Sequence, residues 1–181
     1  MTGRSRAAKL FVAALAVSLA CMASAWPQDD VAHLQERFDK EPDGVRKAKT
    51  LRKLGDLQFV QERAATKAND FTAAGLIMEK YRDNAKAALE ALKKTHPQAE
   101  KHPSGYKELE FHVGIGLREV RDVILAMPEA YRPPMQIVEK DLLDMDMELL
   151  KLLFPRRPGE QPPAKAPASS PTKENSPEKQ P

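Results

Sequence analysis

Apolar residues recur with a helical period through the whole middle of this chain, which leaves few architectures open. They are spaced by alternating steps of three and four residues, so that each set lies on one stripe of a helix. No alternating β pattern is present, and the sequence therefore predicts an all-α fold, a four- to five-helix antiparallel bundle. The four stripes are Ala48, Leu51, Leu54, Leu57, Ala64, Ala65 and Ala68; Phe71, Ala74, Met78, Tyr81, Ala85, Ala88 and Leu92; Tyr106, Leu109, Val113, Leu117, Val120 and Ile124; and Met135, Val138, Leu142, Met145, Leu149 and Leu152.

Turn-forming residues between the stripes indicate where the helices begin and end. A Pro-Asp-Gly sequence at 42–44 precedes the first long helix, and Asp70 is the expected N-cap of the second. Ser104 is a candidate cap for the third, and the proline pair at 133–134 suits the first turn of the last. The expected helices lie near residues 29–40, 45–68, 71–95, 105–126 and 134–154.

The first 25 residues have the three parts of a secretory signal peptide. A basic head ends at Lys9, an apolar run follows from Leu10 to Met22, and Ala23-Ser24-Ala25 forms a small-x-small cleavage site. The apolar run is too short to span a hydrocarbon core of ~30 Å as a stable helix. We expect cleavage after Ala25 and a periplasmic or secreted protein, with an uncleaved anchor as the alternative.

Cys21 leaves a second route open, because a lipoprotein signal needs a cysteine after a box of small residues. Here the box is Ser18-Leu19-Ala20-Cys21, with serine where a bulky apolar residue is usual. If Cys21 is lipidated, the protein sits on a membrane; otherwise Cys21 leaves with the signal. The mature chain then contains no cysteine, which excludes disulfides, zinc–thiolate sites, iron–sulfur clusters and cysteine nucleophiles.

Charge and composition divide the rest of the chain into two parts. Removing the signal removes three of 29 basic residues and no acids, leaving 26 basic against 26 acidic side chains. A neutral domain lacks the positive surface of a nucleic-acid-binding protein, and no nucleic-acid partner is expected. Residues 26–154 form one helical domain. Residues 155–181 are rich in proline and poor in large apolar residues, which predicts a disordered tail, either a spacer or a segment that binds a groove.

Part of the domain resembles one tetratricopeptide-type helical hairpin. Leu51, Leu54-Gly55 and Phe59 are similar to the first helix of that family, in which a small residue lets the partner helix approach. Asn69-Asp70-Phe71 and Ala73-Ala74 resemble its turn and the small residue after it. The chain departs from the family in placing Gly55 and Phe71 sixteen residues apart, against about nine, which amounts to two added helical turns. Only about 40 residues share the likeness, without a second copy. The resemblance implies a helical protein-interaction architecture within an exported bacterial helical protein.

Titratable residues offer few groupings that suit catalysis or metal binding. His96 and His102 flank a loop with Glu100, and His112 lies beside a core stripe, where a boundary position is expected. No histidine pair has metal-ligand spacing. On the last helix Asp141, Asp144 and Glu148 share one flank, which is either a solvated face or an oxygen site for a hard cation. Arg46, Lys47, Lys49, Arg52 and Lys53 crowd the start of the first long helix and form a possible counterpart.

Glycine and methionine add two further hypotheses. Gly114 and Gly116 interrupt a helical pattern, at a cost of about 1 kcal/mol each relative to alanine. They predict either a close helix approach, or a kink or ligand contact. On the last helix Met135 and Met145 fall on the core stripe. Met147 falls off that stripe and is either exposed or packed against a further helix.

These observations predict a non-enzymatic interaction or adaptor module of the cell envelope, bound to another envelope protein. We assign it no catalytic residue, no metal site and no cofactor, because no nucleophile–base grouping or phosphate loop is present. The alternative is a small-ligand or metal-binding envelope protein that uses the His96–His102 loop or the acidic helix. A hydrolytic enzyme and a membrane-tethered structural protein are the remaining readings, the latter only if Cys21 is lipidated.

Overall fold

A computed structural model of the chain describes residues 28–155, which form five α-helices and one 3-10 turn, without a strand in that range. This confirms the all-α prediction, and the helices begin and end within about three residues of the expected bounds. The predicted signal peptide, Cys21 and all but the first residue of the predicted tail lie outside the described residues. The elements are α2 (Gln28–Lys40), α3 (Gly44–Lys67), α4 (Phe71–Thr95), α5 (Pro103–Ala126), η2 (Glu129–Tyr131) and α6 (Arg132–Leu153).

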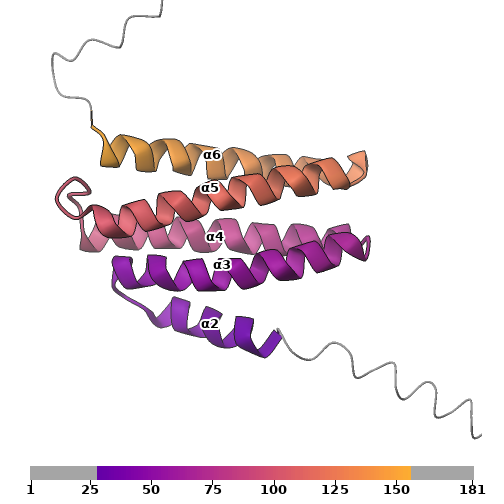
Figure 1. Cartoon of the computed structure of the whole chain (residues 1–181), viewed down its shortest axis with the longest axis horizontal. Helices are drawn as coiled ribbons and strands as arrows, with labels where there is room; N and C mark the ends of the chain where they lie inside the picture. Colours follow the sequence, from indigo (N-terminus) through magenta and orange to yellow (C-terminus); the bar gives the residue numbers. More distant parts are fainter. Residues whose placement is uncertain (1–27, 156–181) are drawn as a thin grey trace, which may run out of the picture.

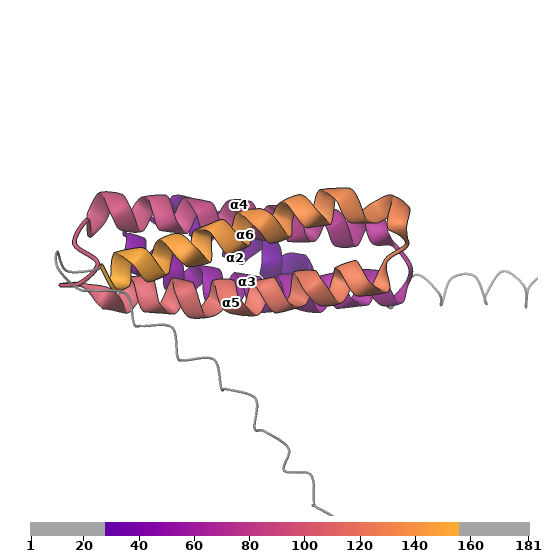
Figure 2. The ribbon, with the colours of Figure 1, turned by 90° about the horizontal axis from the view of Figure 1, so that it is seen from above.

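The four long helices lie side by side as an elongated bundle in which consecutive helices are antiparallel (Figure 1). The α3–α4 hairpin packs against α5, and α6 lies over α4 and α5 (Figure 2). The shorter α2 packs on the opposite side of the bundle from α6, against the first half of α3. No helix in residues 28–155 combines the length and the apolar content that a bilayer crossing requires.

The predicted stripes of α4, α5 and α6 form most of the core. Their side chains are fully or nearly fully buried from Ala74 to Leu92, from Tyr106 to Val120 and from Met135 to Leu149. Leu152 and Ile124, at the ends of two stripes, are only partly buried and pack against the core edge. Burial of such side chains contributes about 1.5–3 kcal/mol each, so packing of these stripes stabilises the bundle.

Aspartate side chains cap two of the helix starts, and the cap predicted at Asp70 is confirmed. Asp43 caps α3 by accepting a hydrogen bond from the Arg46 amide at 2.9 Å, and Asp70 caps α4 by accepting one from the Ala73 amide at 3.0 Å. The prediction that Ser104 caps α5 is wrong. That helix begins at Pro103, whose fixed φ suits a first turn and whose missing N–H needs no partner.

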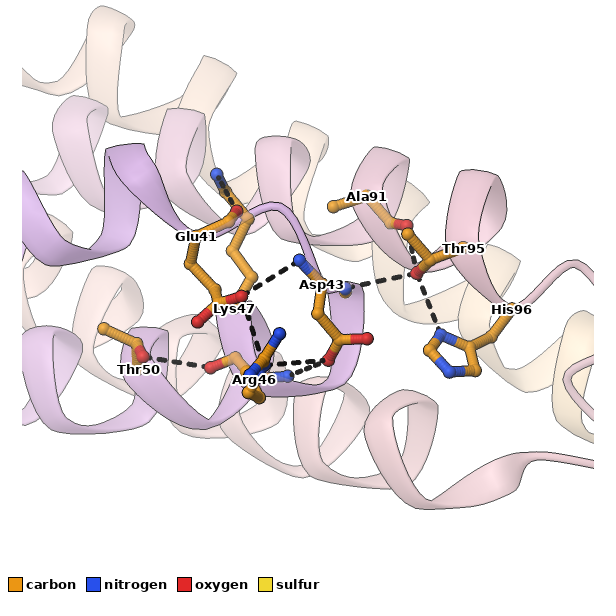
Figure 3. Close-up of polar contacts among 9 residues, drawn as sticks. Glu41, Asp43, Arg46, Lys47, Thr50, Ala91, Thr95 and His96 are labelled. Atoms are coloured by element: carbon orange, nitrogen blue, oxygen red, sulfur yellow. Dashed lines mark hydrogen bonds and ion pairs between the residues drawn. The ribbon is translucent and has the colours of Figure 1, made fainter.

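The start of α3 is tied to the end of α4 by a close backbone approach. The Gly44 amide donates to Thr95 Oγ1 at 3.1 Å, and that hydroxyl donates to the Ala91 carbonyl at 2.8 Å (Figure 3). A Cβ on Gly44 would lie 2.6 Å from the Leu92 backbone nitrogen and Cα. The absence of a side chain at this position therefore lets the two helix ends meet.

Candidate functional site

The acidic flank of α6 is paired with basic residues of α4 and α6. Arg82 on α4 lies 3.4 Å from Asp141, and Lys93 on α4 lies 2.5 Å from Glu148. Lys140, on α6 itself, lies 2.8 Å from Asp144. The acidic flank therefore does not meet the basic cluster of α3, which lies on the opposite side of the bundle (Figure 1).

The basic cluster at the start of α3 is only partly neutralised. Arg46 lies 3.2 Å from Glu41, and Arg52 lies 3.0 Å from Glu108 on α5. Lys47 donates to the Glu41 carbonyl (Figure 3). The Lys47 ammonium group also lies over the Phe38 ring, 4.6 Å from its centroid. The two remaining members, Lys49 and Lys53, are exposed and form no ion pair within residues 28–155.

The two loop histidines come together without a third ligand. The ring centroids of His96 and His102 are 5.9 Å apart, and the Tyr106 hydroxyl donates to the His96 carbonyl at 2.9 Å. Within residues 28–155, no group of three or more His, Cys, Asp or Glu side chains is arranged to hold a metal ion. Neither the loop nor the acidic helix thus offers a metal a complete set of ligands in this part of the chain.

His112 is a core residue, which corrects the prediction of a boundary position. His112 is only 1 % exposed. Its ring stacks on the ring of Phe59 on α3, with the two ring centroids 5.5 Å apart. Its Nδ1 lies 2.9 Å from the hydroxyl of Tyr81 on α4, which also donates to the His112 carbonyl at 2.9 Å. The ring fits because Gly55 faces it: a Cβ on Gly55 would overlap His112 Cε1.

The His112 ring joins three helices rather than forming an open site. Its Nε2 reaches Asp56 of α3 at 3.4 Å, and Asp56 is the exposed end of the network. Burial lowers the pKa of His112, while the hydrogen bond and charge of Asp56 oppose that shift. Because the Tyr81 and His112 rings are both buried, a substrate has no access to them, and the network holds α3, α4 and α5 together.

The second half of α3 buries polar residues where alanines were expected. Ala64 and Ala68 are exposed, and the inward positions are taken by Gln58, Phe59 and Glu62. Leu57 and Ala65 are only partly buried. The stripe prediction is therefore wrong from Leu57 onward, because a count of apolar residues does not detect polar residues that a bundle buries.

Glu62 is a buried carboxyl group with one hydrogen-bond partner. The Thr66 hydroxyl donates to it at 2.7 Å, while the side-chain oxygen of Gln58, one turn earlier, has no partner in residues 28–155. Burial raises the pKa of Glu62, and the hydrogen bond from Thr66 lowers it by a smaller amount. The ionised carboxylate is thus held in surroundings that favour its neutral form.

We expect Glu62→Gln to stabilise the protein at neutral pH, because glutamine keeps the bond from Thr66 without the buried charge. A carboxyl whose folded pKa is raised stabilises the fold below its unfolded pKa of about 4.5 and loses that contribution as pH rises through the folded value. The difference in the free energy of unfolding between Glu62→Gln and wild type should therefore shrink towards zero as pH falls from the folded to the unfolded pKa of Glu62. Urea unfolding at several pH values measures this difference. A Glu62→Gln variant less stable than wild type at pH 7 would contradict the conclusion that the buried charge of Glu62 destabilises the fold.

A second apolar stripe runs along the solvent side of α6. Leu143, Met147, Leu150 and Phe154 recur at steps of four, three and four, and all four are exposed, Phe154 to 68 %. Phe111 of the neighbouring α5 is 63 % exposed. Met135 and Met145 are buried as predicted, whereas Met147 belongs to this exposed set. We call these five residues the outer α5/α6 face.

Gly114 of α5 and Asp146 of α6 border the outer α5/α6 face, one turn from Phe111 and from Leu150 respectively. Arg121 of α5 lies 2.7 Å from Glu139 of α6 and sets the register of the two antiparallel helices. Two turns further along each helix, on the same sides, are Gly114 and Asp146. A Cβ on Gly114 would meet nothing within 4 Å, in contrast to Gly116, where it would overlap the Tyr81 ring.

Asp146 is a polar residue among the exposed apolar side chains of α6. It lies between Leu143 and Leu150 on the same row of α6 and forms no ion pair within the described residues. Burial raises the pKa of its carboxyl group. The close-approach hypothesis therefore holds for Gly116, where a Cβ would overlap the Tyr81 ring, while Gly114 leaves open space. The α6 part of the face could have been predicted from the sequence, because its apolar residues repeat at helical steps.

Comparisons with known proteins add no family to this description. No protein-family model, curated protein or solved structure matched the chain.

Proposed function

We propose that this chain is an exported, non-enzymatic interaction module that binds another cell-envelope protein through the outer α5/α6 face. The observation that carries the proposal is the second apolar stripe of α6, exposed beside Phe111 of α5. Single exposed apolar residues are ordinary, whereas a contiguous group is typical of an interaction surface. The resemblance to a tetratricopeptide hairpin supports the same class of function, and the signal-like N-terminus supports the location.

The chemistry of the face favours an amphipathic helix as the bound segment. An amphipathic helix binds through apolar side chains that recur every three or four residues. Leu143, Met147 and Leu150 recur at the same steps and can pack against them. At Gly114 no atom of another helix in residues 28–155 lies within 4 Å of where a Cβ would be, which leaves room for a close approach. Asp146 would meet a lysine or arginine of the partner, since desolvating an unpaired carboxylate is unfavourable.

Replacing two anchors of the face tests the proposal. Phe111→Ser with Leu150→Ser should weaken capture of the partner from crosslinked envelope extract by about tenfold or more, as loss of buried apolar anchors does. The matched control is Val60→Ser with Leu76→Ser, two exposed apolar residues on α3 and α4. All four side chains are exposed, so both double variants should keep the wild-type melting temperature.

Gly114→Ala is expected to change partner binding and fold stability in opposite directions. The added methyl group should stabilise the helix while obstructing a partner backbone, so this variant should fold better and bind more weakly. Equal capture by wild type, the face variants and Gly114→Ala would contradict the proposal. A captured protein whose crosslinked segment lacks a helical apolar repeat would contradict the proposed partner chemistry.

A further inference from the structure

A groove crosses the outer surface of α3 between α2 and α5, and basic residues gather along it. Its volume is about 560 Å³, within the usual range for small-molecule sites. It is separate from the outer α5/α6 face, because α2 and α6 lie on opposite sides of the bundle (Figure 1). Its cationic lining residues are Arg37, Arg46, Lys49, Arg52 and Lys53.

Three of these cations have no anionic partner in residues 28–155. Arg46 and Arg52 are engaged by Glu41 and Glu108, whereas Arg37, Lys49 and Lys53 form no ion pair there. Lys49 and Lys53 are one turn apart on α3, a like-charge arrangement that destabilises a helix. Arg37 adds a third positive charge from α2. An external anion would relieve this repulsion.

We propose that this groove binds a small ligand through a phosphate group held by Arg37, Lys49 and Lys53. A guanidinium offers a planar pair of donors and an ammonium a compact charge, and both suit phosphate oxygens. A doubly charged phosphate monoester balances three cations better than a single carboxylate does. Leu34 and the nearly buried Thr50 line the adjoining part of the groove and leave a less polar surface for the organic portion.

Three acids also line the groove, namely Glu41, Asp56 and Glu108. Glu41 follows α2 and is paired with Arg46 at 3.2 Å. Glu108 is neutralised by Arg52 at 3.0 Å, and Asp56 contacts the Nε2 atom of buried His112 at 3.4 Å. Both belong to the side that faces α5, whereas Arg37 lies on the α2 side. Because Arg46 already engages Glu41, the phosphate is placed beside Arg37, Lys49 and Lys53, away from Asp56.

Calorimetry on the purified exported protein tests the site with glycerol 3-phosphate, and with phosphatidylcholine vesicles that contain or lack phosphatidic acid. Lys49→Gln with Lys53→Gln should weaken binding of the phosphate probe about tenfold or more. The matched control, Lys80→Gln with Lys94→Gln, removes two exposed α4 lysines that do not line the groove and should bind like wild type. Unchanged melting temperatures show that both variants are folded.

Either source of phosphate supports the inference and identifies the ligand class. Binding of glycerol 3-phosphate without preference for phosphatidic acid vesicles assigns a soluble phosphate ester, and binding of those vesicles alone assigns a lipid headgroup. The inference is overturned if neither probe binds, if succinate binds as tightly as glycerol 3-phosphate, or if both double variants lose the same affinity. None of these results depends on whether the outer α5/α6 face binds a protein.

Discussion

Tyr81→Ala is expected to lower the free energy of unfolding by about 3–5 kcal/mol, the usual cost of removing a large buried aromatic side chain. The Tyr81 side chain is fully buried, and its ring lies 4.7 Å from that of Phe59 on α3. The Tyr81 hydroxyl also lies within hydrogen-bond distance of the Nδ1 atom and the carbonyl oxygen of His112 on α5. Alanine would leave a cavity between three helices and two polar groups without their partner.

Tyr81→Phe separates the two parts of this loss. Phenylalanine keeps the packing but removes the hydroxyl, so the expected loss is about 1–3 kcal/mol, the cost of leaving buried polar groups unsatisfied. Urea unfolding followed by circular dichroism measures both variants. If Tyr81→Ala cost less than Tyr81→Phe, or neither changed the midpoint, Tyr81 would not be the residue that joins α3, α4 and α5.

Gly116→Ala is expected to destabilise the protein by about 1–3 kcal/mol, whereas Gly114→Ala, two residues earlier, should stabilise it by about 0.5–1 kcal/mol. At Gly116 a Cβ would lie 2.8 Å from both Cζ and Oη of Tyr81, whose ring is fixed by burial and hydrogen bonds, so the core must shift. At Gly114 the methyl group enters open space, and only the helix preference for alanine remains.

Thermal unfolding of the two single variants measures this contrast within one helix. Because both replacements are glycine to alanine in α5, their helix propensities cancel, and the difference reports the space around each Cβ. Stabilisation by both would show that the Tyr81 ring moves easily. Destabilisation by both would show that Gly114 is needed for packing within the bundle.

Local patterns were sufficient to predict the helices of this protein. Steps of three and four residues identify the core side of α4, because all of its buried positions except Asn84 are hydrophobic. The helix ends follow from chemistry within a few residues, as at Asp43 and Asp70, whose side chains cap the next helix. Pattern counting fails in α3, where Gln58 and Glu62 are buried. Glu62 accepts a hydrogen bond from Thr66, a local partner that a count of apolar residues does not detect.

Features that depend on two helices at once could not be predicted from one stripe. His112 is buried because Gly55, on another helix, leaves room for its ring. The acidic flank of α6 pairs with Arg82 and Lys93 because α4 lies beside it, which no spacing within α6 indicates. The exposed stripe from Leu143 to Phe154 was visible as a repeat, but only the packing of α6 on α4 and α5 shows that it faces outward.

The central claim is that a helix of another envelope protein docks on the outer α5/α6 face. Photocrosslinking from position 147 in the full chain tests this docking most directly, with position 76 on α4 as an exposed control. We predict one dominant product from position 147, joined to a segment with apolar residues at helical steps and a lysine or arginine among them. Products no stronger than those from position 76, or only between copies of this chain or with lipid, would contradict the claim.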